Sequence, residues 1–220
     1  MKQKISMTMI AAGLIGCMSS AAALAADQGF YAYVSAGVSD SDRKAETDTT
    51  LRNAGAVFTS TADARDTAYK IQVGYQYNRN LAVEGGYVDL GKYTYHALAT
   101  VPAGATRDGN VKIDGWNLDV VGRLPVSDAV AVFGKIGLVS YDLSYTSQCT
   151  VIACPSPNRS KRGTPLHYGV GVDWDFGQNW FARAEYEVYE KVGEAFSTTG
   201  TTGTSRANVN VAGIGIGYRF

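Results

Sequence analysis

Hydrophobic and polar residues alternate with a period of two in eight segments of the chain. Such alternation is typical of β-strands, because successive side chains point to opposite faces of the sheet. The clearest segment is Tyr69–Tyr77 (YKIQVGYQY), where one face is aromatic or aliphatic and the other carries lysine and glutamine. This pattern suits a strand with lipid on one side and a polar interior on the other. The segments are Gly29–Val38, Tyr69–Tyr77, Leu81–Leu90, Gly115–Leu124, Val130–Tyr141, His167–Phe176, Trp180–Tyr189 and Val209–Phe220.

The connections between these segments alternate strictly between short and long. The short connections are Asn78–Asn80, Pro125–Ala129 and Gly177–Asn179. The long, polar connections are Ser39–Thr67, Gly91–Asn110, Asp142–Leu166 and Lys191–Arg206. Outer-membrane barrels have short periplasmic turns and long external loops. We therefore predict an all-β fold, an eight-stranded antiparallel up-and-down transmembrane β-barrel with both termini on the periplasmic side.

The last segment places Ile214, Ile216, Tyr218 and the terminal Phe220 on one face, with three glycines and an arginine on the other. A soluble sandwich strand is the alternative, but a glycine and arginine face suits a narrow lumen better. We predict that Ile216, Tyr218 and Phe220 form the C-terminal signal for the barrel-assembly machinery, with periplasmic chaperones as further partners.

The N-terminus predicts export. Lys2 and Lys4 precede an apolar run that is too short to span a bilayer, and small residues follow it up to Ala25. This pattern predicts a signal peptide over residues 1–25 and a barrel domain over residues 26–220. Leu14-Ile15-Gly16-Cys17 leaves one alternative, a bacterial lipobox that would make a lipidated Cys17 the mature N-terminus.

Composition narrows the class further. Lysine plus arginine equals aspartate plus glutamate at 20 each, so no basic field indicates nucleic acid. Nothing after the signal is long and apolar enough for a transmembrane helix. Cys149 and Cys154 form an even pair in a polar stretch of an exported chain, and we predict a local disulfide between them. Without a nearby third ligand they predict no metal site, and we expect no cofactor.

Charged residues recur on the inward face of the predicted strands. Eight strands enclose an interior that side chains can fill, and carboxylates withdrawn from water need partners. We expect an inward set of near-balanced charge made of Lys70, Arg123, Lys135, Arg183, Arg219, Glu84, Asp119, Asp173, Asp175, Glu185 and Glu187. The predicted lumen ion-pair network consists of Glu84, Asp119, Arg123, Lys135, Asp173, Arg183 and Glu185.

The segments GYQYNRNLAVEGGYVDLG, GRLPVSDAVAVFGKIG, WFARAEYEVY and GIGYRF resemble the eight-stranded transmembrane domain of the OmpA family and its small OmpX-like relatives. The resemblance runs from about Gly29 to Phe220 and implies a location in the outer membrane of a Gram-negative bacterium. OmpA continues into a peptidoglycan-binding domain, whereas this chain stops at Phe220, so we expect no cell-wall anchoring.

The resemblance also implies a site. The inward charged cluster of the family corresponds in this sequence to Glu84, Lys135, Asp173, Arg183 and Glu185. In OmpA-like barrels such a cluster crosses the lumen, and exchange of ion-pair partners is thought to gate a narrow pore. A strand-four lysine of that cluster is Val121 here. This departure weakens the inference of gating and leaves the lumen ion pairs expected.

Enzymes also occur on small outer-membrane barrels, but the titratable residues do not favour one. His96 lies in a predicted loop, where we expect surface exposure, and His167 begins a strand on the lumen side near the outer rim, within reach of Glu187 or Asp142. No serine in a catalytic context stands beside either histidine. We predict no catalytic residues and no enzymatic activity; a lipid A-modifying enzyme is the least favoured alternative.

The sequence therefore predicts an integral outer-membrane protein with a structural or surface-exposed role. It is expected to be a monomer in contact with outer-membrane lipid. A narrow gated pore for small solutes or ions, and an adhesin acting through the long external loops, remain open alternatives, and the sequence names no external ligand.

Overall fold

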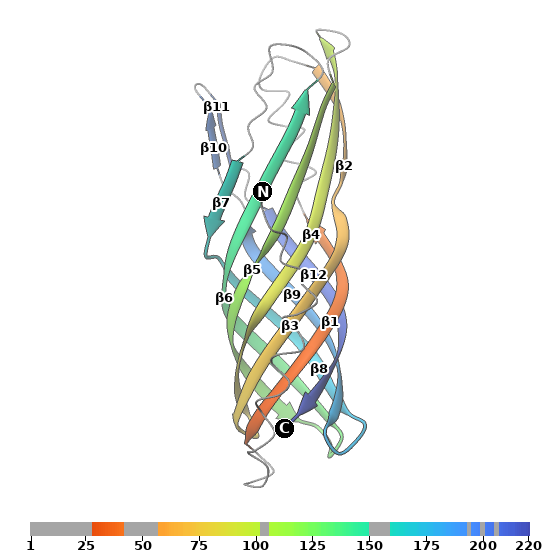
Figure 1. Ribbon diagram of the computed structural model, residues 1–220, viewed down its shortest axis with the longest axis vertical. Coiled ribbons are helices and arrows are strands. Elements are labelled where there is room, and N and C mark those ends of the chain that lie inside the picture. The colour runs from red at the N-terminus through yellow and green to blue at the C-terminus, as the bar shows by residue number, and fades with distance from the viewer. Residues whose placement is uncertain are drawn as a thin grey trace, which may run out of the picture.

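The computed structural model describes residues 28–41, 57–101, 106–149, 159–192, 195–198, 201–204 and 207–220. Eight antiparallel strands in this part of the chain close into a barrel (Figure 1), which confirms the predicted fold class. The predicted signal peptide over residues 1–25, Cys17 and Cys154 lie outside the described residues. Among the residues described, no helix is long and apolar enough to cross a membrane.

Each barrel strand pairs with its neighbours in the chain, and the first pairs with the last, from Tyr31 opposite Arg219 to Ser41 opposite Val209. The barrel strands are β1 (Gly29–Ser41), β3 (Arg65–Asn78), β4 (Leu81–Val101), β5 (Thr106–Pro125), β6 (Val130–Cys149), β8 (Leu166–Asp175), β9 (Trp180–Val192) and β12 (Ala207–Arg219). Two further strands join the same sheet, β2 (Val57–Asp63) beside β4 and β7 (Arg159–Gly163) beside β6. β10 (Ala195–Thr198) and β11 (Thr201–Thr204) form a separate hairpin.

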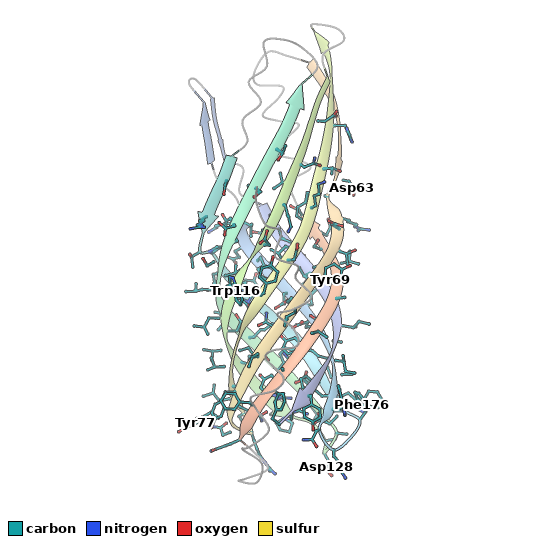
Figure 2. The ribbon with its side chains drawn as sticks, in the orientation of Figure 1. Asp63, Tyr69, Tyr77, Trp116, Asp128 and Phe176 are labelled. Carbon is teal, nitrogen blue, oxygen red and sulfur yellow. The ribbon has the colours of Figure 1, made fainter. Side chains whose placement is uncertain are left out.

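An apolar belt surrounds the lower part of the barrel. Tyr69 and Trp116 mark its upper limit, and Tyr77 and Phe176 its lower limit (Figure 2). From Tyr69 to Tyr77 a strand tilted by about 40° rises roughly 20 Å along the barrel axis, close to the hydrocarbon height of an outer-membrane barrel. The outward faces are those that the alternation predicts, because most residues assigned to lipid are exposed and most of their neighbours along each strand are buried. The tight turn at Asp128 lies below this belt (Figure 2), on the side where the C-terminus is marked in Figure 1.

The strands on one side of the barrel are much longer than predicted. The connection expected as a loop over Gly91–Asn110 is mostly strand, since β4 and β5 stay paired up to Leu98 opposite Thr106. β6 likewise continues through the start of the connection predicted after Tyr141. These strands rise above the belt (Figure 1), and from Tyr87 to Val101 the rise is roughly 35 Å at the same tilt.

The polarity of the strands reverses where they leave the belt. On β5, Leu118 and Val120 face outward within the belt, whereas above it the outward residues are Asp114 and Lys112 and the apolar Ile113 is buried. The prediction ended the strands at this reversal because it followed only the pattern of outward apolar residues. Above the belt the same strands follow the ordinary pattern of a water-soluble sheet, with apolar residues inside.

Candidate functional site

The lumen is the part of this protein where ionisable side chains gather, and it is layered along the barrel axis. An aromatic layer lies toward the end of the barrel that holds the C-terminus, charged side chains occupy the middle, and a cluster of apolar side chains, the plug, lies in the opposite half. The members of the plug are Ala68, Val88, Leu90, Tyr93, Val111, Ile113, Val139, Tyr141, Leu143, Tyr189, Val192, Val209 and Val211. Each of these side chains is buried, so the plug is a continuous apolar core.

Arg183 of β9 is the centre of the lower charged group. Its Nη1 donates to Glu84 Oε1 at 2.6 Å, and its Nε and Nη2 donate to the two carboxylate oxygens of Asp173 at 2.7 and 3.0 Å. Arg123 Nη2 donates to Asp173 Oδ2 at 2.5 Å. All four side chains are almost completely buried. The structure thus joins four of the predicted network residues in one chain of ion pairs.

Aromatic rings enclose the Arg183 guanidinium from below. Its Cζ lies 4.3 Å from the ring centres of both Tyr33 and Phe133, a cation–π arrangement. Tyr31 Oη donates to Glu84 Oε1 at 2.7 Å and Tyr33 Oη donates to Glu84 Oε2 at 3.1 Å. The Glu84 carboxylate is therefore fully bonded without water, as a buried charge requires.

A second group higher in the lumen joins two lysines to two glutamates. Lys135 Nζ lies 2.6 Å from Glu185 Oε2 and 2.5 Å from Glu187 Oε1. Lys70 pairs with the same two glutamates. Lys135 and Glu185 belong to the predicted network; Lys70 and Glu187 belong to the predicted inward set and complete this tetrad.

Asp119, also predicted for the network, has a different partner. Its Oδ1 lies 2.9 Å from His167 Nε2, and Asn117 Nδ2 donates to its Oδ2 at 2.7 Å. His167 lies on the lumen side, as predicted, but away from the rim: its ring is fully buried and stacks on Tyr189 at 4.8 Å and 9°, and the acid within ion-pair distance is Asp119. The register places His167 beside Gly137, which in turn lies beside Asp119 on β5.

Other residues singled out by the sequence lie apart from this network. Val121 is buried in the lower apolar cluster, beside aromatic residues such as Tyr31 and Phe133. Asp175 pairs with Arg219 near the C-terminus, where both are partly exposed. Asp142 pairs with Arg162 on the outer surface at 2.7 Å.

His96 lies on β4 rather than in a loop, and it is exposed, as predicted, with its Nδ1 2.6 Å from Asp108 Oδ1. The backbone of Cys149 ends β6, but Cys154 is outside the described residues, so the disulfide remains a prediction.

The outer face of the sheet above the belt carries its own charges. Lys112 Nζ lies 3.3 Å from Asp89 Oδ2 and 3.6 Å from Asp114 Oδ1. Partial burial lowers the pKa of Lys112, but the two carboxylates outweigh that effect and raise it above its ordinary value. Tyr87 Oη also donates to Asp114 at 2.9 Å. These charged groups mark where the protein surface emerges from hydrocarbon.

A sequence comparison agrees with this geometry. The family model for the outer membrane protein beta-barrel domain matches residues 9–220. The chain belongs to this family. Outer membrane protein A of Serratia marcescens is 26% identical over 148 residues, which are 67% of this chain and 38% of that protein. The predicted resemblance to OmpA is confirmed, although the chain spans well under half the length of this relative.

Among solved structures, one outer-membrane barrel supports the same fold, and a second is less similar in structure. Neisserial surface protein A is 11% identical and aligns with a TM-score of 0.53, covering 87% of this chain and 97% of that one. The attachment invasion locus protein of Yersinia pestis, solved in complex with the heparin analogue sucrose octasulfate, is 19% identical with a TM-score of 0.46, covering 87% and 99%. As a member of this family, the protein is located in the bacterial outer membrane, as predicted.

Proposed function

We propose that this protein is a closed, non-enzymatic barrel that holds a rigid external sheet above the outer membrane. Its role in this proposal is structural and surface-exposed, and it acts as a monomer in contact with outer-membrane lipid. The observation that carries the proposal is the apolar plug stacked on the charged layer. Two clusters of buried apolar side chains lie in the lumen, and the charged side chains between them are buried as well.

The plug argues against the narrow-pore alternative. A gate made only of ion pairs could open by exchange of partners, because each group would keep a counter-charge. Here an ion that passed the Lys70 and Lys135 layer would next meet Val139, Ile113 and other apolar side chains that offer no ligand. Loss of hydration there costs several kcal/mol or more for a charge.

The long strands support the surface-exposed part of the proposal. β4, β5 and β6 continue as one sheet above the belt, joined by β2 and β7 at its sides (Figure 1). Paired strands with an apolar inner face are stiffer than free loops. The sheet is therefore a rigid base at this end of the barrel, and loops held on a rigid scaffold are frequent sites of binding.

Neighbouring positions on β5 provide a direct test in whole cells. Ile113 is fully buried in the plug, whereas the Lys112 side chain is 49% exposed on the outer face. We would place a single cysteine at each position, Ile113→Cys or Lys112→Cys, in a background where Cys149 and Cys154 are serine. A membrane-impermeant thiol reagent is then added to intact cells.

We expect rapid labelling of the Lys112→Cys protein and at least a tenfold slower labelling of the Ile113→Cys protein. Purified wild-type protein in planar bilayers should give no discrete currents. Equal labelling at the two positions, or steady single-channel currents from protein shown to be folded by its heat-modifiable gel mobility, would refute the closed barrel. Failure of Lys112→Cys to react on intact cells would refute the external position of the sheet.

A further inference from the structure

The lipid-facing belt is hollowed on the side of the barrel where the first and last strands meet. Ala36 on β1 lies between Tyr69 of β3 and Ile214 of β12. Ala184 on β9 lies between Ile214 and Val172 of β8. Because each alanine is flanked by larger side chains, the surface is recessed at both positions. The hollow has a volume of about 870 Å³, which is the size of many small-ligand sites.

The hollow extends along the belt. It begins at Tyr69, which marks the upper limit of the belt (Figure 2), and it reaches Trp174, two residues before Phe176 at the lower limit. A second hollow of about 520 Å³ shares Ala36 with the first and continues to Val38. The outward side chains that line both hollows are aliphatic or aromatic. Together the two hollows form an apolar groove that suits an aliphatic chain.

Arg65 lies above this groove. It is four residues before Tyr69 on β3, which places it roughly 10 Å higher at a strand tilt of about 40°. The headgroup region of a bilayer is roughly 5 to 8 Å thick, and a long arginine side chain can reach down into it. The guanidinium Nε donates to Asp40 Oδ2 at 3.1 Å. In the described part of the chain no acceptor bonds its two Nη groups, so both are free to donate to a phosphate.

Two carboxylates beside Arg65 determine which headgroup fits. Asp40 accepts from its Nε, and Asp63 accepts from its backbone N–H at 3.3 Å. Both carboxylates are at least partly exposed, so this part of the surface carries one cation and two anions. A phosphate alone would be repelled by the carboxylates, whereas a phosphate joined to an ammonium group supplies a partner for each sign of charge.

We propose that the groove is a binding site for one lipid molecule whose headgroup joins a phosphate to an amine, as in phosphatidylethanolamine. An acyl chain lies against Ala36 and Ala184, the phosphate accepts hydrogen bonds from the Nη groups of Arg65, and the ammonium group faces Asp40. The site is continuous with the belt, which membership of an outer-membrane family already places in lipid. The site concerns the outer surface alone and does not depend on whether the lumen conducts.

Native mass spectrometry of the folded protein tests the site, because it counts the lipids that stay bound to an intact barrel. The protein is mixed with phosphatidylethanolamine in detergent, and the detergent is removed in the spectrometer. We expect one lipid per chain on the wild type and at least fivefold lower retention by Ala184→Phe, which fills the groove. Gly122→Phe adds the same ring at an exposed and open position of β5, so it should retain the lipid as the wild type does.

The headgroup contacts are tested separately. Arg65→Gln should lower retention of phosphatidylethanolamine at least fivefold, and the wild type should retain diacylglycerol, which has no phosphate, equally poorly. Phosphatidylglycerol, which has no ammonium group, should be retained less than phosphatidylethanolamine.

Three results would overturn the proposal. The first is equal retention by the wild type and by Ala184→Phe that shows the compact band of a folded barrel. The second is retention of diacylglycerol as strong as that of phosphatidylethanolamine. The third is a mass of two chains without lipid, which would assign the groove to a second copy of the protein.

Discussion

Replacement of Arg183 by methionine should be among the most damaging single changes in this barrel. The side chain is fully buried, and its loss removes the ion pair of Glu84 at 2.6 Å. Asp173 keeps Arg123 at 2.5 Å, so one carboxylate rather than two loses its cation. Breaking a buried pair in this way costs about 3 to 5 kcal/mol, and the lost contacts to the Tyr33 and Phe133 rings add about 1 kcal/mol or more.

The free energy of unfolding should therefore fall by about 4 to 6 kcal/mol. With an m-value of about 2 kcal/mol per molar urea, the midpoint falls by roughly 2 to 3 M. Unfolding in phospholipid vesicles can be followed by tryptophan fluorescence and by the compact band on unboiled gels. Arg65→Met is the matched control, because Arg65 pairs with Asp40 while its side chain is 73% exposed. A surface pair of this kind contributes about 0 to 1 kcal/mol.

A second substitution separates lost charge balance from lost packing. Glu84→Gln in the Arg183→Met background removes the uncompensated carboxylate, so it should restore about 1 to 3 kcal/mol, the range of coupling between contacting residues. The reasoning fails if Arg183→Met unfolds within 1 kcal/mol of the wild type, or if the double variant is less stable than Arg183→Met alone.

Two further predictions concern the lipid-facing surface. Val120→Arg places a cation near the middle of the belt and should lower the free energy of unfolding in vesicles by about 2 to 4 kcal/mol. Val126→Arg, at the predicted periplasmic rim, should lower it by about 1 kcal/mol or less. Equal losses for the two variants would contradict the assigned belt. Phe220→Ala should lower the yield of compact, heat-modifiable protein in the outer membrane, whereas Phe176→Ala, at a similarly exposed aromatic site, should not; unchanged yield for Phe220→Ala would remove this residue from the predicted assembly signal.

The belt and its lumen could be predicted from the sequence because every side chain of a strand there points either to lipid or into the lumen. Lys70 and Gln72 alternate with Tyr69 and Ile71, and a slip of one residue would turn the first two toward lipid. The inward set follows from this alternation alone. The partners within it do not, because which carboxylate reaches which cation depends on side chains that cross the lumen between strands far apart in the sequence.

The apolar plug and the long external strands could not be found by the same rule. Val111 and Ile113 alternate with polar residues as clearly as the apolar residues of the belt do. Here, however, the apolar side chains point into the barrel and the polar ones point outward. A segment such as NVKID has the same period in a soluble sheet and in a membrane strand. The alternation itself was visible in the sequence. It did not show that the apolar face, which points outward within the belt, points inward above it.

The reversal of polarity along β4 and β5 also fixes how deeply the barrel sits in the bilayer. If the protein sank by two residues along each strand, Asp89 and Lys112 would move toward the acyl chains; if it rose, Leu118 would enter water. Charged residues near the interface resist displacement in one direction and apolar residues in the other, and each shift would cost up to a few kcal/mol per misplaced side chain. The height of the external surface above the membrane is therefore set by the position on β4 and β5 at which the outward residues change from apolar to charged.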